Sequence, residues 1–322
     1  MALRVLIPGA LSTVQDLGRA GYERFGVSRS GAMDAFALRA ANRLVANAAS
    51  AAAVEFVLDA PVFQAEADCI AACTGFGWAM EVQGRSVGSW RAALVRRGEM
   101  VRFLPESGLA AGWGYFAVGG GISTPPVMGS RATDLRAGLG GLEGRALREG
   151  DVLPVAPAPL DLQIAGRWLP PHWRPAYGTA VTVPAIPGPQ EAIFSVLSYA
   201  EFWETSWQIS PTSDRMGCRL IGSPLERVSQ AELLSEGIAP GSVQVPPDGQ
   251  PIVLMADRPT TGGYPKIATV AQCGLPLIAQ AMPGRGRVRF EVVTVEEAQA
   301  RWRGLIRGLE TGVEDDGEDP AY

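Results

Sequence analysis

The amino-acid sequence predicts a mainly β protein with few α-helices, and three observations lead to this fold class. Its 322 residues include 39 glycines and 25 prolines, which is typical of chains with many turns. Short apolar runs follow one another along the chain, and each ends near a glycine or a proline. Helical periodicity is clear at only a few places. Many short strands separated by turn residues favour barrels or sandwiches.

The expected strands are short apolar segments bounded by turn residues. Residues 251–256 and 267–270 are expected to form two strands on either side of a polar cluster. The other main strands are expected at residues 54–58, 69–73, 94–95, 100–104, 114–118, 152–155 and 288–293.

Three helices are expected. The first follows Asp34, an N-cap residue that precedes good helix formers with apolar residues at helical spacing from Phe36 onward. The second follows Thr294, which forms a capping box with Glu297. A third, short helix is expected at residues 199–207.

The length predicts two domains, because a domain has about 150 residues. A proline-rich segment at residues 154–175 lacks helical or strand periodicity and is the expected boundary. The two flanks resemble each other weakly, and each opens with a short apolar strand and Pro-Gly, so an internal duplication is a plausible alternative to chance. We expect domains at residues 1–165 and 166–307, followed by an acidic disordered tail at residues 308–322.

Charge and hydropathy argue against several classes of partner. The net charge is −5, and no run of Lys or Arg exceeds two residues, so neither nucleic acid nor an anionic membrane is expected as a partner. The N-terminus has no signal-peptide pattern, and no apolar run reaches the ~18 residues of a membrane span. We therefore expect a cytoplasmic protein.

Histidine and cysteine usage limits the possible chemistry. The single histidine, His172, argues against a His-based triad or a multi-histidine metal site, and we expect no metal in this chain. The cysteines match no zinc or redox spacing and are expected to be buried small hydrophobic residues; they are Cys69, Cys73, Cys218 and Cys273.

The polar cluster D-R-P-T-T-G-G-Y-P-K at residues 257–266 predicts a site loop. Its glycines permit positive φ and a close approach of the backbone to a ligand. We expect Lys266 to neutralise or position an anionic substrate, and Asp257 to act as a base or to hold Arg258. A hairpin whose polar groups satisfy turn amides is the alternative. The expected catalytic residues are Lys266, Asp257, Arg258 and Thr261, and the expected substrate-binding residues of the loop are Thr260, Gly262, Gly263 and Tyr264.

A second polar region near the N-terminus predicts an anion pocket. Glycines at 18 and 21 can form a backbone nest beside guanidinium groups, which suits a carboxylate or a phosphate. The alternative is a polar turn in which Asp16 and Arg19 pair with each other. The expected substrate-binding residues of this region are Gln15, Asp16, Arg19, Ser30 and Asp34.

A third polar region covers residues 129–147. Its G-x-G-G-x-x-G pattern lacks the surrounding βαβ unit, which argues against a dinucleotide site, and no P-loop pattern occurs in the chain. Arg131 and Arg136 are expected to bind an acidic group of the substrate, unless they are salt-bridged loop residues.

Taken in order, these segments resemble subunit 2 of allophanate hydrolase, also described as the biotin-dependent carboxyltransferase family. This family includes the C subunit of 5-oxoprolinase and the Kip-inhibitor antagonist. The resemblance spans most of the chain and departs from the family at Pro259, where we expect Gln. It depends on T-V-Q-D-L-G-R-x-G-Y at 13–22, G-V-S-x-S-G-A-M-D at 26–34, G-S-R-x-T-D-L-R at 129–136, G-G-L-x-G-R-x-L at 140–147, G-P-Q at 188–190, S-D-R-M-G at 213–217, G-S-V-Q-V-P-P-D-G-Q-P at 241–251, and the site loop.

The resemblance implies two cyclophilin-like β-barrel domains that work with a partner. In the 5-oxoprolinase branch, the chain would be the C subunit and would act with the A and B subunits in the ATP-dependent opening of 5-oxoproline to glutamate, with ATP used by the complex. In the urea carboxylase branch, it would help to move carboxyl from carboxybiotin to urea or a related amide, and only that alternative involves biotin. A regulatory antagonist that binds a Kip-type kinase inhibitor is the third possibility. Stand-alone chains of this kind resemble the 5-oxoprolinase branch more, so a small amide substrate is expected.

Overall fold

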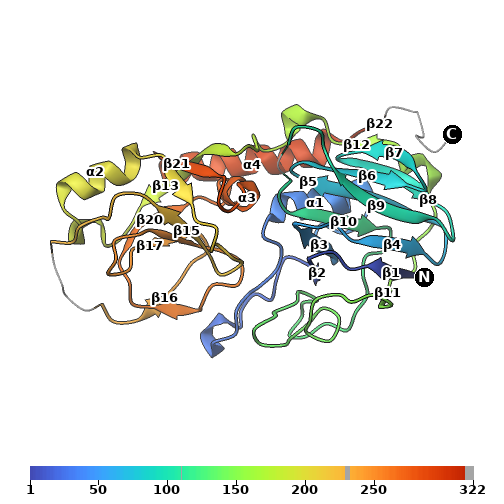
Figure 1. Cartoon of the computed structure of the whole chain (residues 1–322), viewed down its shortest axis with the longest axis horizontal. Helices are drawn as coiled ribbons and strands as arrows, with labels where there is room; N and C mark the ends of the chain where they lie inside the picture. Colours follow the sequence, from blue (N-terminus) through green and yellow to red (C-terminus); the bar gives the residue numbers. More distant parts are fainter. Residues whose placement is uncertain (110, 229–232, 316–322) are drawn as a thin grey trace. The chain divides into compact units, whose positions relative to one another are not determined.

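The computed structural model describes residues 1–109, 111–228 and 233–315, which divide into two compact units (Figure 1). Unit 1 comprises Met1–Arg19, Ser30–Arg174 and the segment that starts at Ile306. Unit 2 comprises Ala20–Arg29 and Pro175–Leu305. Neither unit is one continuous stretch of sequence, unlike the expected division at residue 165.

The strands of unit 1 form two sheets. The six-stranded sheet has the order β11 (Val152–Pro154), β1 (Ala2–Ile7), β4 (Val62–Ala65), β9 (Met100–Pro105), β6 (Trp78–Val82) and β7 (Arg85–Gly88). The seven-stranded sheet has the order β2 (Leu11–Gln15), β3 (Ala53–Val57), β10 (Gly114–Val118), β5 (Cys69–Gly75), β8 (Arg91–Val95), β12 (Arg167–Trp168) and β22 (Glu314–Asp315).

One apolar core is built from the facing sides of these two sheets. Alternate residues of most of these strands supply it, because side chains of a strand point to opposite faces with a period of two. At its centre, Phe103 packs against Phe56 and Phe116 with ring centroids 4.7 and 5.1 Å apart. Unit 1 is therefore a sandwich of two sheets.

Helix α1 (Ala35–Leu44) covers the other face of the seven-stranded sheet, against β5 and β10 (Figure 1). Every residue of β5 is buried because one face contacts the core and the other contacts this helix. The predicted helix after Asp34 is confirmed, since the Asp34 carboxylate accepts hydrogen bonds from the amides of Phe36 and Ala37 at 3.0 and 2.9 Å.

Unit 2 contains a closed seven-stranded barrel. Its strand order is β13 (Ala180–Pro187), β20 (Lys266–Val270), β17 (Ser242–Gln244), β18 (Ile252–Leu254), β15 (Gly217–Ile221), β14 (Trp207–Ile209) and β21 (Arg287–Val292). Neighbouring strands are antiparallel, except that β13 and β21 pair in parallel and close the barrel. A separate two-stranded ribbon joins β16 (Glu236–Gly237) to β19 (Thr261–Gly262).

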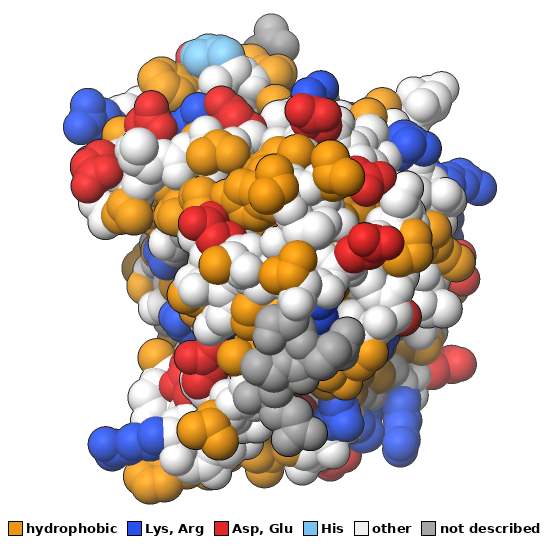
Figure 2. All heavy atoms as spheres, turned by 90° about the vertical axis from the view of Figure 1, so that its left-hand side faces the viewer, with side chains coloured by type: hydrophobic (Ala, Val, Ile, Leu, Met, Phe, Trp, Pro, Cys, Tyr) orange, Lys and Arg blue, Asp and Glu red, His pale blue; other side chains and the backbone are white. Residues whose placement is uncertain are grey.

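Helix α2 (Val196–Glu204) packs on the barrel through Phe202, whose ring stacks on Phe290 with centroids 4.6 Å apart. It begins after its N-cap Ser195, three residues before the expected start, and ends before β14. On its outer side Val196 and Leu197 are exposed. The face shown in Figure 2 carries such hydrophobic side chains among acidic and basic ones.

Two further helices are α3 (Leu275–Gln280), which the sequence patterns did not predict, and α4 (Val295–Thr311). The predicted capping box of α4 is confirmed, because the amides and side chains of Thr294 and Glu297 bond reciprocally at 2.8 and 3.2 Å. The helix continues to Thr311 and β22 follows, so ordered elements occupy the first half of the expected tail; residues 316–322 lie outside the described residues.

The mainly β prediction is confirmed: the described residues contain many short strands, one closed barrel and four α-helices. The expected burial of all four cysteines is also confirmed. Within the described part of the chain, none of the helices combines the length and apolar character that crossing a bilayer requires.

Candidate functional site

The site loop of unit 2 connects two barrel strands that are not neighbours. It leaves β18 at Leu254 and enters β20 at Lys266, and its middle pairs with β16 through β19. The expected strand at 251–256 is shorter than predicted, because only Ile252–Leu254 pairs with the barrel. The loop is thus anchored at three points along its length.

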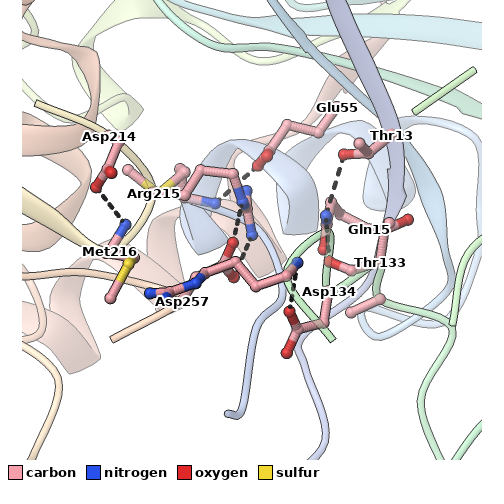
Figure 3. A network of polar contacts seen from close by, with 12 residues as sticks. Thr13, Gln15, Glu55, Thr133, Asp134, Asp214, Arg215, Met216 and Asp257 are labelled. Carbon is pink, nitrogen blue, oxygen red and sulfur yellow. Dashed lines mark hydrogen bonds and ion pairs between the residues drawn. The ribbon is translucent and has the colours of Figure 1, made fainter. Parts of the chain in front are cut away.

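Asp257 forms a buried ion pair with Arg215, not with Arg258 as one of our expectations held. Its two carboxylate oxygens accept from Nε and Nη2 of Arg215 at 2.8 and 3.0 Å (Figure 3). The backbone amide of Asp257 also donates to the carbonyl of Arg215 at 2.8 Å. The expectation that Asp257 holds Arg258 is wrong, because the S-D-R-M-G turn brings Arg215 to the carboxylate first.

Lys266 is buried at the start of β20, and its ammonium group donates to Oε1 of Glu236 at 2.5 Å. Gln190 joins this contact: its Nε2 donates to the same oxygen at 2.8 Å, and its Oε1 accepts from the Lys266 amide at 3.1 Å. The hydrogen bond from Lys266 is the main cause that lowers the pKa of Glu236. The positive charge of Lys266 is therefore balanced within unit 2.

Arg258 is a buried cation for which the described residues supply no ion-pair partner. Its Nε donates to the carbonyl of Ile238 at 3.1 Å, and its side chain is among the buried charged groups. Burial lowers the pKa of the Arg258 guanidinium, and the neighbouring charge of Arg29 lowers it further, whereas Glu23 raises it. Arg29 and Glu23 were missed by our assignment, although both lie in the second polar region.

The remaining expected residues of the loop follow Arg258 in the sequence. The carbonyl of Thr260 accepts from the Ile238 amide at 3.1 Å, and the carbonyl of Tyr264 accepts from Gln244 at 3.4 Å. Of the residues expected to face a ligand, two are exposed, namely Thr261 and Tyr264. The other three are half-buried, namely Thr260, Gly262 and Gly263. Pro259, where the family pattern differs, is exposed.

In unit 1, Asp16 organises two turns and does not pair with Arg19. Its Oδ1 accepts from the Gly18 amide and the Ser130 hydroxyl at 2.8 and 2.7 Å, and its Oδ2 accepts from the Arg131 amide at 2.6 Å. The alternative of an Asp16–Arg19 pair is therefore wrong. The buried carboxylate fastens the N-terminal strand to the third polar region, which is more than 100 residues away in the sequence.

Gln15 and Arg19 contact consecutive backbone carbonyls. Nε2 of Gln15 donates to the carbonyl of Thr133 at 3.1 Å and to the Thr13 hydroxyl at 3.0 Å (Figure 3). Nη2 of Arg19 donates to the carbonyl of Ala132. Both side chains are almost fully buried, so two of the expected substrate-binding residues meet at residues 132–133.

Asp34 and Ser30 lie in the turn before α1. The Asp34 carboxylate caps the helix, and its amide donates to the hydroxyl of Tyr115 at 2.7 Å. That hydroxyl donates to Oε2 of Glu55 at 2.7 Å, and Glu55 also accepts from the Met33 amide at 2.7 Å. Ser30 is buried with φ at 53°. The hydrogen-bond network around the buried Glu55 was not predicted, because Glu55 and Tyr115 lie within strands whose other residues are apolar.

The two arginines of the third polar region lie in different surroundings. Nε of Arg131 donates to the carbonyl of Thr124 at 2.7 Å, which holds the half-buried side chain in its loop. Arg136 is exposed, and its amide donates to Asp134 at 3.1 Å within a turn. The partner of Arg131 is thus a backbone carbonyl, and not the carboxylate of the salt bridge that our alternative described.

The glycines of residues 138–144 allow the third polar region to pack closely on the rest of unit 1. Gly140 has φ at 67°, and a Cβ atom there would lie 2.8 Å from Nη2 of Arg19. A Cβ atom at Gly141 would overlap the hydroxyl of Thr133. The glycine-rich pattern therefore permits close packing over Arg19 and Thr133.

Comparison with known families decides the family of this chain. Residues 25–292 match the family model described as "Carboxyltransferase domain, subdomain A and B". This chain belongs to that carboxyltransferase domain family. The resemblance found in the sequence motifs is confirmed.

Relatives of similar length and much longer relatives both align over nearly the whole chain. The C subunit of 5-oxoprolinase from Escherichia coli is 41% identical over 92% of this chain and 93% of its own length. Urea amidolyase of Lachancea kluyveri is 32% identical over 96% of this chain, which spans only 18% of that protein. The crystal structure of the K. lactis urea amidolyase superposes with a TM-score of 0.89 at 26% identity, over 98% of this chain and 20% of that one.

The described residues offer guanidinium and ammonium groups more than metal ligands. No group of three His, Cys, Asp or Glu side chains gathers as a metal site would need within the described part of the chain. The chemistry that the geometry supports is binding of anionic and amide groups by fixed cations, hydroxyls and backbone amides.

Proposed function

We propose that this chain is the C subunit of an ATP-dependent 5-oxoprolinase, which acts with the A and B subunits and is not active alone. The observation that carries the proposal is its likeness to the C subunits of 5-oxoprolinases, which are 41% identical in Escherichia coli and 40% in Haemophilus influenzae over about nine-tenths of both chains. Full-length likeness of this kind favours a shared role more than a likeness to one part of a longer protein.

Arg258 is the group that this proposal assigns to the reacting amide. A buried guanidinium without an ion-pair partner among the described residues can stabilise negative charge that develops on an amide oxygen. The hydroxyl groups of Thr260 and Thr261 and the glycine backbone of the same loop can orient a planar amide. Tyr264 belongs to the same loop and is exposed.

Lys266 and Asp257 act mainly as positioning residues in this proposal. Lys266 neutralises Glu236, and Asp257 neutralises Arg215, so each fixes one end of the loop that carries Arg258. Their effect on catalysis would arise through the loop geometry, because a misplaced catalytic group lowers the rate steeply.

No step of ATP chemistry is assigned to this chain. Its glycine-rich loop at residues 138–144 contains no lysine and packs over Arg19, unlike a loop that cradles phosphates. ATP would be used by the assembled complex. Biotin would be required only if the chain were a carboxyltransferase component for urea or a related amide, a second candidate favoured by the TM-score of 0.89 to urea amidolyase.

The deciding experiment is reconstitution with the A and B subunits from the same source. We expect ATP-dependent formation of glutamate from 5-oxoproline by the three-subunit complex, and none by this chain alone. Arg258→Ala should lower kcat by about 100-fold or more. Arg301→Ala is the matched control, because Arg301 is an exposed arginine of unit 2 that pairs with Glu291.

Two outcomes would contradict these assignments. A complex that carboxylates urea from carboxybiotin but leaves 5-oxoproline unchanged would replace the proposed reaction with carboxyl transfer. Unchanged turnover in Lys266→Ala with both substrates would show that the loop does not depend on its contact with Glu236.

A further inference from the structure

Arg19 and Gln15 of unit 1 hold buried polar atoms that the described protein groups leave without hydrogen bonds. Arg19 is 1% exposed, and its Nε and Nη1 have no hydrogen-bond partner. Gln15 is 0% exposed, and its Oε1 has no partner either. Native proteins rarely leave such groups unsatisfied, so each instance requires an explanation.

The unsatisfied atoms belong to one small site. Gln15 is fastened to the carbonyl of Thr133 by its Nε2, and Arg19 is fastened to the adjacent carbonyl of Ala132 by its Nη2. This anchoring also assigns the amide orientation of Gln15, because only its NH2 group can donate to a carbonyl. The backbone of Gly140 closes over the guanidinium, as a Cβ atom there would lie 2.8 Å from Nη2.

The groups that remain specify the chemistry of a ligand. Nε and Nη1 of Arg19 are charged donors and require an anionic acceptor, whereas Oε1 of Gln15 is an acceptor and requires a donor. One guanidinium balances the single charge of a carboxylate. A phosphate would bring a second charge and place an oxygen against Oε1 of Gln15, which is repulsive. The matching ligand is small, carries one carboxylate and has an N–H group beside it.

We propose that Gln15 and Arg19 of unit 1 form a buried binding site, additional to the loop that carries Arg258, for a small N–H-bearing carboxylate of the cyclic-amide type. Arg19 takes the carboxylate and Gln15 takes the amide N–H. The inference rests on the proposed function only in naming the class of amide, since the site itself follows from the buried groups of unit 1. Because both side chains are buried, residues 138–144 must move to admit the ligand, and association should be slower than diffusion allows.

The test uses three related five-membered-ring probes with the full chain, alone and with the A and B subunits. L-5-oxoproline has both the carboxylate and the lactam N–H. 2-Pyrrolidinone lacks the carboxylate, and 5-oxotetrahydrofuran-2-carboxylate replaces the N–H by oxygen. We expect calorimetry to show binding of L-5-oxoproline, with each analogue weaker by about 10-fold or more, since a hydrogen bond to a buried or charged group contributes about this factor.

Two variants assign the contacts to Arg19. Arg19→Met should abolish the preference for probes that carry a carboxylate, and Arg19→Lys, which keeps the charge without the planar fork, should bind L-5-oxoproline with intermediate affinity. Arg102→Ala is the control, because Arg102 is an exposed arginine of β9 in the same unit and belongs to none of the candidate site regions. Circular dichroism and the thermal midpoint verify that each variant is folded; if Arg19→Met does not fold, Arg19→Lys decides the question.

The possible outcomes separate this inference from the proposed function. If the complex hydrolyses 5-oxoproline and its KM and probe preferences are unchanged in the Arg19 variants, the site is excluded while the function stands. If no assembly hydrolyses 5-oxoproline but the chain binds it through Arg19, the function fails and the site stands. Equal binding of all three probes, or binding of none of them, would overturn the inference.

Discussion

The substitution Asp257→Asn tests whether the buried ion pair with Arg215 maintains the geometry of the site loop. The side chains of Arg215 and Asp257 are only 7% and 8% exposed, and they are joined by two hydrogen bonds of 2.8 and 3.0 Å. The pair lies just beyond the point where β15 and β18 begin to pair at Gly217 and Leu254. Its loss should therefore loosen this edge of the barrel.

The expected cost follows from burial. Removing one partner of a buried ion pair takes away the attraction that offsets the burial of the other charge, which destabilises proteins by about 3–5 kcal/mol. Glu291→Gln is a matched control, because Glu291 makes the same two-bond contact with Arg301 at 2.8 and 3.0 Å while both side chains are about 45% exposed. An exposed pair contributes about 0–1 kcal/mol. The two substitutions thus differ mainly in burial.

The assay is amide hydrogen exchange of the β15 and β18 peptides, measured by mass spectrometry at increasing urea concentration. It reports the stability of this part of unit 2, which a global unfolding curve of a two-unit chain would average. Urea is chosen because it does not screen charges. If Asp257→Asn lowered the protection free energy by no more than Glu291→Gln, the structural role given to Asp257 would be refuted.

Three further predictions concern the stability of the two units. Tyr115→Phe should lower the unfolding free energy by about 1–3 kcal/mol in urea titrations, because it removes the buried hydrogen bond to Glu55; a loss below about 0.5 kcal/mol would contradict this. Burial raises the pKa of Cys69 and Cys218 from 9.0 to about 12. Their contribution to the free energy of unfolding is therefore complete below pH 9 and should be lost between about pH 9 and 12. Labelling of these thiols by a thiol reagent at pH 8, without unfolding, would contradict their burial. Thr294→Ala should cost about 1 kcal/mol, measured as faster exchange in the first turn of α4, and Ser206→Ala provides a surface comparison.

Local patterns in the sequence were sufficient for many elements. The helix after Asp34 and the helix after Thr294 were predicted correctly, because a cap depends on residues two or three positions apart. Strand positions such as Gly114–Val118 agree with the structure for the same reason, since a short apolar run bounded by turn residues is visible within a few positions. Helix α3 was missed because its six residues include a proline and are too few to show a helical period.

The sequence by itself determined that this chain is mainly β, that its cysteines are buried and that it belongs to the carboxyltransferase domain family. Only the tertiary structure decided the partners of the charged groups: Arg215 for Asp257 across 42 residues, and the carbonyl of Thr133 for Gln15 across 118. The physical reason is that such contacts depend on strand register and loop paths, which bring distant residues within hydrogen-bonding distance of each other. No local pattern in the sequence indicates which residues will meet. For that reason the sequence could name Arg19, Gln15 and Arg258 as candidates, but it could not show which of their atoms remain for a ligand.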